Sequence, residues 1–398
     1  MKRVIRLYYG FTFLFSLLLW VPIFYEFQRR VGLSEAQIFS LQSLYYFAFC
    51  FFEIPTGYIS DRFGHRASLR LGGVLLALGN LLPVLGVDYS WFAAHFLLVA
   101  LARSLVSGAA SAYVYDALQA EGQGAHYRRI EGNARAMSLA GKVLFWAGVG
   151  AAMEWHLSLP YALTALASAG SALLAWMLPA DSAQSSQEDT PGPVQTFLAI
   201  SRSWPVLLFM IQGLSIFVLS RICQINLFQP LLLDRGLSVA SLGFVMGLIT
   251  LAEALGSARP QWVRRWAGDT GGVFVLTVVI AISLSVMAAS SSMGAVLALV
   301  VLSFATGLAY PIQRQLLNDA ISGAGLGAIR ATALSVESIF DRAVSGTVAL
   351  VLGPVLAMKA MGTFLYGSAV LSIVAAVVIL FWIRNLRLAT AAADTVLD

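Results

Sequence analysis

Charged residues are scarce in this sequence of 398 residues. They make up 11% of it, whereas a soluble domain usually carries about a quarter. Hydrophobic residues make up 59%, and the mean hydropathy is +0.80. Because this small number of charges cannot cover a surface that faces water, we expect most of the chain to lie in lipid. The composition excludes an ordinary soluble globular protein, a disordered chain and a collagen-like chain.

Cysteine and histidine are also rare, with two and four residues. Cys50 and Cys223 lie within apolar runs, which indicates packing rather than a disulfide or a metal site. The sequence has no metal-binding cysteine and histidine spacing, no phosphate-binding glycine loop and no Gly-x-Ser-x-Gly motif. We therefore expect no metal, no cofactor, no enzyme activity and no ATP-driven pump. The basic residues form no single patch, so nucleic acid is not an expected partner.

Long apolar runs determine the expected fold. A helix needs about 20 mostly apolar residues to cross a bilayer. The runs lack the period-two alternation of barrel strands, and the serines and glycine at 290–294 divide the longest run. The prediction is an all-α membrane protein with twelve spans. These spans cover 5–25, 36–59, 68–87, 91–117, 134–153, 160–178, 205–228, 238–258, 272–290, 293–315, 330–355 and 361–383.

The distribution of basic residues predicts the orientation. Most of the 25 Lys and Arg residues, among them Arg62, Arg66 and Arg314, fall in segments on one side of the predicted spans. Because cytoplasmic loops are enriched in basic residues, this side and both termini are predicted to be cytoplasmic. The first apolar run has no small-x-small cleavage site after it, so we interpret it as a span rather than a secretory signal. We expect a multi-pass protein of the inner (plasma) membrane.

One polar stretch interrupts the spans. Residues 180–193 are rich in Ser, Gln, acidic residues and Pro, which is typical of a flexible linker. The predicted organisation is a six-helix bundle at 1–179, a cytoplasmic linker at 180–204 and a second six-helix bundle at 205–398. Duplicated halves are a common plan for transporters, with the binding site at their interface near the membrane midplane.

A few charged residues fall deep within predicted spans, where each costs about 2.5–3.5 kcal/mol on insertion scales. Glu337 and Asp341 are four residues apart, so both project from one helix face and repel each other unless a cation or proton intervenes. Two interpretations stay open. These acids form a packed ion pair with Arg221 or Lys142, or they form a proton or substrate site.

Glu53 is the preferred candidate for carrying a proton. Burial disfavours the charged form of a carboxyl group, so a carboxyl in the membrane can exchange a proton near neutral pH. Glu53 lies just before Pro55, and a proline bends a helix. Protonation could therefore be coupled to a change of shape. A structural hydrogen bond to a neighbouring helix is the alternative, and Glu253 is the similar residue in the second half.

The most specific motif lies between the second and third predicted spans. Gly57 would let a neighbouring helix approach closely, and Gly64 permits a tight turn with positive φ. Asp61 suits a helix N-terminus, while Arg62 and Arg66 can bind helix ends, acids or lipid phosphates. These residues suit a latch that holds in only one conformational state.

This segment resembles the signature of the major facilitator superfamily, Gly-x-x-x-Asp-Arg/Lys-x-Gly-Arg-Arg/Lys. It matches at Gly57, Asp61, Arg62, Gly64 and Arg66. It departs at His65, where the family usually has arginine. The twelve predicted spans and the central linker extend the resemblance over the whole chain. The resemblance implies that this loop stabilises the outward-open state through contacts with span eleven, and that Asp116 belongs to the same latch.

The resemblance also implies roles for other residues. Arg103 is similar to a span-four arginine implicated in proton transfer, although Gly108 follows it by five residues rather than four. The proline-containing antiporter motif of span five is absent, which removes the best sequence argument for drug antiport. Spans one, four, seven and ten are implied to line a cavity. The candidate proton-coupling residues are Glu53, Arg103, Glu253, Glu337 and Asp341, and the candidate cavity residues are Arg103, Arg221, Lys142 and Tyr310.

The expected function is secondary active transport by alternating access, driven by a proton gradient. We expect a monomer that exports a small amphiphilic compound, a direction favoured mostly by resemblance to bacterial efflux proteins. Proton-coupled uptake of a small polar solute is one alternative. A non-transporting receptor or assembly partner and a lipid flippase are two others.

Overall fold

The computed structural model describes residues 1–180, 198, 200–326 and 330–397, and these residues form helices and connecting turns without a strand. The side chains of Ile54, Asp61, 330–332, 384 and 386–397 lie outside this description. Most of the predicted linker 180–204 is also outside it.

The chain divides into two compact units. Unit 1 comprises residues 1–186, 236–248 and 346–357, and unit 2 comprises 187–235, 249–345 and 358–398. The predicted halves, 1–179 and 205–398, remain a prediction.

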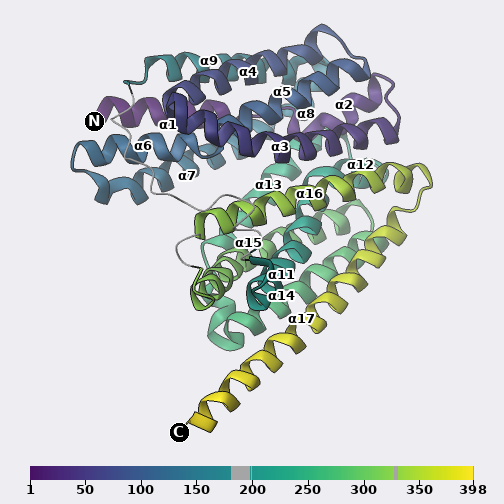
Figure 1. Cartoon of the computed structure of the whole chain (residues 1–398). Helices are drawn as coiled ribbons and strands as arrows, with labels where there is room; N and C mark the ends of the chain where they lie inside the picture. The colour runs from purple at the N-terminus through teal and green to yellow at the C-terminus, as the bar shows by residue number, and fades with distance from the viewer. Residues whose placement is uncertain (181–197, 199, 327–329, 398) are drawn as a thin grey trace. The chain divides into compact units, whose positions relative to one another are not determined.

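The helices of the first half follow in chain order (Figure 1). They are α1 (Lys2–Ser16), η1 (Val21–Ile23), α2 (Phe24–Arg30), α3 (Glu35–Phe63), α4 (His65–Leu85), α5 (Tyr89–Ser107), α6 (Ala109–Ala120), η2 (Gly124–His126), α7 (Tyr127–Trp146), α8 (Val149–Trp155) and α9 (Leu159–Met177).

The second half continues with longer helices. They are α11 (Trp204–Arg221), the π-helix η3 (Ile222–Leu227), α12 (Phe228–Leu233), α13 (Val239–Ser257), α14 (Gln261–Ala289), α15 (Ser292–Gly323), α16 (Arg330–Ala357) and α17 (Met361–Leu397).

Every predicted span coincides with one or more of these helices. Among the described residues, ten helical segments are long and apolar enough to cross a membrane. The pair α7 and α8, which bends by 43°, makes an eleventh. The predicted span 36–59 falls on α3, which has 29 residues and is not among the ten. The membrane fold is therefore confirmed, while the count of twelve and the orientation remain predictions.

The junction between α3 and α4 follows from local sequence. Ser34 begins α3 with a capping box, in which its side chain and that of Gln37 bind each other's backbone N–H groups. Gly64 separates α3 from α4 with φ 91°. Only glycine adopts this conformation without strain, so the predicted positive φ at Gly64 is confirmed.

Small residues let the helices of unit 1 pack closely. α4 packs against α5 and α9 (Figure 1). A Cβ added at Gly73 of α4 would lie 2.8 Å from the Cα of Ala172 on α9. This approach is possible only without a side chain at position 73.

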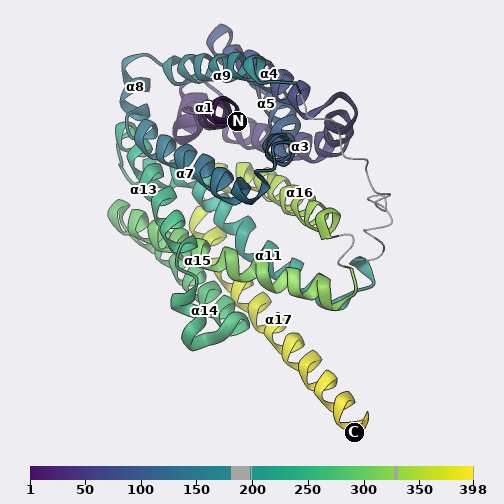
Figure 2. The same cartoon turned by 90° about the vertical axis from the view of Figure 1, so that its left-hand side faces the viewer.

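Glycines have the same role in unit 2. α14 packs against both α15 and α17 (Figure 2). A Cβ at Gly307 of α15 would overlap the carbonyl oxygen of Glu253 on α13. The backbone beside Glu253 is therefore held tightly.

The first predicted span is broken in the middle. Residues 17–20 leave the helix between α1 and η1. The N–H of Leu19 donates to Thr164 Oγ1 on α9 at 3.0 Å, and Trp146 Nε1 of α7 donates to the carbonyl of Leu18 at 3.0 Å. A backbone group without a partner is costly in lipid. These two side chains therefore stabilise the break.

Candidate functional site

A cavity of about 200 Å³ lies within unit 2, between α11, α15 and α16. Three guanidinium groups and two carboxylates line it, together with aromatic and amide side chains. The lining residues are Gly213, Leu214, Phe217, Arg221, Tyr310, Gln313, Arg314, Glu337, Ser338, Asp341 and Arg342.

Two ion pairs cross this cavity and hold both acids of α16. Arg221 of α11 pairs with Asp341 and also donates to Ser345 Oγ at 3.3 Å. Arg314 of α15 pairs with Glu337. The repulsion expected between Glu337 and Asp341 is thus relieved by one cation each. For Asp341 the partner is Arg221, one of the two cations that the sequence suggested.

Arg314 is the cavity residue that sequence analysis misplaced. The prediction ended span ten at residue 315 and put Arg314 with the cytoplasmic residues. In the structure α15 continues to Gly323, and Arg314 faces Glu337 across the cavity. Its spacing from Tyr310 could have revealed it, because residues four apart share one face of a helix.

Tyr310 and Phe217 form an aromatic wall of the cavity. Their rings meet edge to face with centroids 5.6 Å apart. The guanidinium of Arg314 lies 5.8 Å from the centre of the Tyr310 ring. Cations are attracted to the faces of aromatic rings, so this contact helps to orient Arg314. The predicted cavity residues Tyr310 and Arg221 therefore line one site.

Glu253, in contrast, contacts a neutral amide. Gln224 Nε2 donates to Glu253 Oε2 at 3.2 Å and to Ser303 Oγ at 2.9 Å. Gln224 lies in the π-helix η3, where span seven departs from regular α-helix. Such π segments occur frequently at functional sites. Sequence analysis missed this residue, because hydropathy does not distinguish a π-helix from an α-helix.

The remaining candidates for coupling and cavity lining lie in unit 1. Glu53 on α3 is half-buried and lines neither of the cavities described in this section. Arg103 on α5 is exposed and forms no ion pair with another described side chain. The Lys142 ammonium on α7 lies 5.9 Å from the Trp146 ring centre. The roles suggested for these three residues remain predictions.

A second cavity, of about 210 Å³, lies within unit 1 and borders the predicted latch. Thr56, Ser60, His65 and Ser104 line it together with Gly57. Thr56 Oγ1 and Ser104 Oγ are 2.8 Å apart and hydrogen-bonded. Within unit 1, a Cβ at Gly57 would meet nothing within 4 Å, and the helix contact lies one residue earlier, at Thr56. The close helix approach expected at Gly57 stays a prediction.

The latch residues contact different partners. His65 is the residue at which the segment departs from the family signature. Its Nε2 lies 3.5 Å from Asp116 Oδ2, and its Nδ1 lies 2.9 Å from Ser60 Oγ. Arg62 Nη1 donates to the Tyr58 hydroxyl at 2.8 Å. Arg66 Nη2 lies 3.5 Å from the Trp176 carbonyl oxygen. The side chain of Asp61 lies outside the described residues.

A carboxylate that sequence analysis did not select lies in unit 1. Glu131 of α7 accepts hydrogen bonds from the Tyr8 hydroxyl at 2.6 Å and from Ser111 Oγ at 3.0 Å. Tyr8 is 1% exposed. The predicted span five began at residue 134, so Glu131 was left outside the membrane in that prediction.

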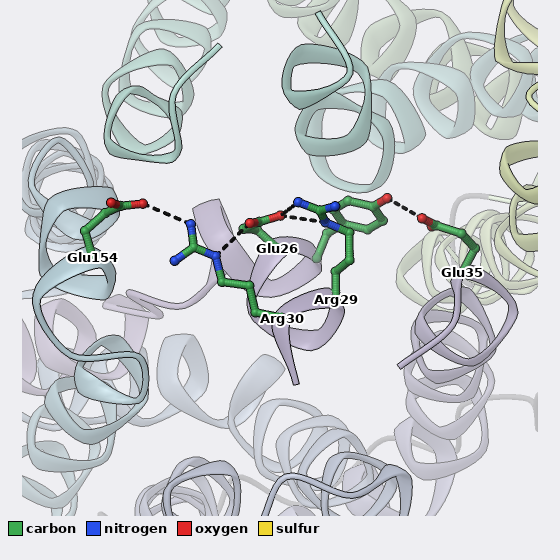
Figure 3. Close-up of polar contacts among 6 residues, drawn as sticks. Glu26, Arg29, Arg30, Glu35 and Glu154 are labelled. Atoms are coloured by element: carbon green, nitrogen blue, oxygen red, sulfur yellow. Dashed lines mark hydrogen bonds and ion pairs between the residues drawn. The ribbon is translucent and has the colours of Figure 1, made fainter. Parts of the chain in front are cut away.

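Another charge cluster joins α2 to α8 (Figure 3). Glu26 is 2% exposed. Its carboxylate accepts hydrogen bonds from Arg29 Nε at 2.8 Å and from Arg30 Nε at 2.7 Å. Arg30 also reaches Glu154 of α8 at 3.0 Å. Glu26, Arg29 and Arg30 are three and four residues apart, a spacing that favours contact on a helix.

The same region is tied to α3. The Tyr25 hydroxyl donates to Glu35 Oε1 at 2.5 Å (Figure 3). Together with the Glu26 cluster, this bond fixes the end of the broken first span against two neighbouring helices.

Comparison with known proteins agrees with this architecture. The sequence matches the Major Facilitator Superfamily over residues 7–340. No curated protein matches the chain. Similar solved structures include the nucleoside transporter NupG, with 15% identity, a TM-score of 0.76, and coverage of 96% of this chain and 99% of that one.

A peptide transporter POT in complex with sulfate has a TM-score of 0.78 at 14% identity, covering 96% of this chain and 94% of that one. A POT family transporter in complex with 5-aminolevulinic acid has 14% identity, a TM-score of 0.75, and the same two coverages, 96% and 94%. At these identities the likeness shows the fold. The family match extends over most of the sequence, and the chain belongs to the Major Facilitator Superfamily of membrane transporters and is not an enzyme.

Proposed function

We propose that this transporter moves a small polar solute together with, or in exchange for, protons, and that the cavity of unit 2 forms part of its solute site. The observation that carries the proposal is the ion pair between Arg314 and Glu337 at that cavity. We also propose that the protein works by alternating access, needs no cofactor, is a monomer and lies in the inner membrane.

The pair gives a proton a specific effect. Arginine stays protonated in proteins, whereas a carboxylate can accept a proton. A proton on Glu337 would convert a neutral pair into a site with one uncompensated positive charge. Glu337 and Arg314 lie on α16 and α15, so loss of the attraction would loosen one helix from the other. A charge crossing the membrane contributes about 2.3 kcal/mol per 100 mV.

The cavity lining favours a polar solute over the amphiphilic compound that the sequence suggested. Five charged side chains make the lining polar, and an apolar molecule would displace water from them without offering a hydrogen bond in return. Nucleosides, peptides and 5-aminolevulinic acid, named for the similar transporters, are polar as well. The export direction has no such support and remains a prediction.

The test is transport by the purified protein in lipid vesicles. A pH gradient is imposed, and accumulation is measured for radiolabelled nucleosides, amino acids, dipeptides and small organic acids. Glu337→Gln is expected to abolish accumulation against a gradient while exchange of solute at equal pH continues. Asp319→Asn, an exposed acid on the same helix as Arg314, serves as the matched control.

Full accumulation by Glu337→Gln would contradict the proposed role of this residue. Glu53→Gln is measured in parallel, since Glu53 is the candidate that the sequence preferred. Transport that is unchanged in both variants would remove both carboxylates from the coupling mechanism.

A further inference from the structure

We infer that unit 1 carries a binding surface for the headgroups of anionic phospholipids, formed by the beginnings of α1 and α7. Six exposed basic side chains make up this basic surface, and they are Lys2, Arg3, Arg6, Arg128, Arg129 and Arg135. The surface belongs to unit 1, whereas the proposed solute site belongs to unit 2. The inference therefore does not depend on the proposed function.

The two helices bring these basic residues to one end of unit 1. α1 and α7 pack against each other (Figure 1). The Tyr8 hydroxyl donates to Glu131 at 2.6 Å, and further along a Cβ added at Gly141 would overlap the ring of Phe13. Residue numbers rise on both helices from the first contact to the second, so the helices run in the same direction. Their beginnings, which carry the six basic residues, therefore lie at the same end.

The nearest acid of α7 does not neutralise its arginines. Glu131 is three residues after Arg128 and four before Arg135, spacings at which ion pairs often form on a helix. Its two oxygens instead accept hydrogen bonds from the hydroxyls of Tyr8 and Ser111. Within the described part of unit 1, neither arginine forms an ion pair or a side-chain hydrogen bond. Both charges are therefore left for a ligand.

The other basic residues of the surface are in the same situation. Within the described residues of unit 1, no ion pair is formed by Lys2, Arg3, Arg6 or Arg129. Glu121, the acid of the loop before α7, lies 3.8 Å from the amino group of Met1. Lys2 and Arg6 are four residues apart, a spacing at which like charges repel on a helix. An anion bound among these side chains would relieve that repulsion.

Other arginines of unit 1 differ, because they contact groups of the protein. Arg70 Nη2 donates to the carbonyl of Trp176 at 3.0 Å, and its guanidinium lies 4.5 Å from the centre of that ring. Arg30 pairs with both Glu26 and Glu154. These arginines join helices of unit 1 to one another. The basic surface instead offers its charges to a ligand from outside.

The place of the basic surface indicates which anion it binds. Lys2–Arg30 is one candidate membrane span, and the bent pair Gly124–Trp146 and Val149–Trp155 is another. The six basic residues lie near the beginnings of these two spans, and basic residues at the end of a span lie at the level of the lipid headgroups. Clusters of about four to eight basic residues beside a span are typical of sites for anionic lipids.

The type of basic residue fits a phosphate. Five of the six are arginines, with Lys2 as the exception. A planar guanidinium binds phosphate oxygens with two parallel hydrogen bonds. A headgroup with net negative charge is favoured over one that also carries a cation, because a cation on the headgroup would be repelled by the surface. A phosphate bound by residues of both helices would join α1 to α7.

Native mass spectrometry of the full-length protein, released from detergent micelles, tests the inference. Phosphatidylglycerol and phosphatidylcholine with the same acyl chains are added in equal amounts. Both have a phosphate, but choline adds a positive charge. We expect at least about tenfold more bound phosphatidylglycerol than phosphatidylcholine. This preference should decrease in about 0.5 M ammonium acetate, because salt screens charges at the surface.

Paired variants locate the effect. Arg6→Gln with Arg135→Gln removes one charge from each helix and should lower the phosphatidylglycerol preference at least about fivefold. Arg6→Lys with Arg135→Lys keeps both charges and should retain most of the preference. The matched control is Arg259→Gln with Arg265→Gln, which removes two exposed arginines of unit 2 and should stay within about twofold of the wild type.

Thermal unfolding without added lipid checks that each variant is folded. If the glutamine pair is not, Arg128→Gln with Arg129→Gln takes its place, with the same expected loss. The inference is overturned if the wild type binds the two lipids equally, or if the glutamine pair behaves like the control. Displacement of phosphatidylglycerol by millimolar inorganic phosphate or by polyglutamate would also overturn it, because the occupant would then be a free anion or an acidic protein segment.

Discussion

Glu131 of unit 1 and the two acids of α16 in unit 2 are satisfied in different ways. In unit 1, Glu131 accepts hydrogen bonds from two hydroxyl groups, those of Tyr8 and Ser111. In unit 2, Glu337 and Asp341 each pair with an arginine, Arg314 and Arg221 respectively. α7, which carries Glu131, and α16, which carries the other two acids, coincide with predicted spans five and eleven.

The two arrangements suit different roles. Hydroxyl donors can hold a helix in place, whereas an ion pair can also change its charge. Hydroxyl donors stabilise a carboxylate without adding charge, so the site stays negative or becomes neutral. An ion pair changes from neutral to positive when its acid takes up a proton. The arrangement in unit 2 is therefore suited to coupling a proton to a solute, and that in unit 1 to positioning α1, α6 and α7.

The largest effect is expected when the two acids are compared in transport. Glu337→Gln should lower pH-driven accumulation at least about 100-fold, since under the proposed function it removes the group that takes up a proton in every cycle. Glu131→Gln should stay within about twofold of the wild type, because an amide oxygen still accepts from Tyr8 and Ser111. Initial rates in vesicles, corrected for the amount of protein inserted, give the comparison.

A large loss in Glu131→Gln would break the proposed contrast. It would make the hydroxyl-bonded acid a second coupling group and spread the mechanism over both units.

Sequence reasoning found the membrane fold and named the partner of one of the two ion pairs among its alternatives. The spacing of Glu337 and Asp341 showed that the two acids needed a cation or a proton, and Arg221 was one of the partners considered. Arg314 was missed because the end of a membrane helix is poorly defined by hydropathy, and an arginine near that end resembles a loop residue.

Other features depend on partners far apart in the sequence. The break at Leu19 is stabilised by Thr164, and no local pattern connects the two. His65 was identified only as a departure from the family signature, yet its ring contacts Asp116. A single sequence shows that a motif departs from its family, but not which contact the new side chain forms.

The next effect concerns stability in unit 2. Arg221→Gln leaves Asp341 partly buried without its cation, which should lower the free energy of unfolding by about 3 kcal/mol. Unfolding by SDS in detergent micelles measures this loss. The double variant Arg221→Gln with Asp341→Asn should recover most of it, because no unpaired charge remains. Equal losses in the single and double variants would mean that packing, rather than charge, holds α11 to α16.

The corresponding change in unit 1 should be smaller. Tyr8→Phe removes one hydrogen bond to Glu131 and leaves the one from Ser111, so we expect a loss of about 2 kcal/mol. The same SDS titration applies, with Tyr9→Phe on the neighbouring position as the control. A loss as large as that of Arg221→Gln would contradict the view that neutral donors are the weaker of the two arrangements.

The smallest effect is expected at the break in the first span, where unit 1 again uses neutral groups. Thr164→Ala removes the acceptor for the Leu19 N–H, a single uncharged hydrogen bond, and should cost about 1 kcal/mol. Thr164→Ser keeps the hydroxyl and should remain close to the wild type. Hydrogen exchange of the Leu19 amide shows whether a loss of stability comes from the missing hydroxyl or from the missing methyl group. Faster exchange in the alanine variant alone shows that the hydroxyl holds the break, whereas equal exchange in both variants shows that the lost methyl group is responsible.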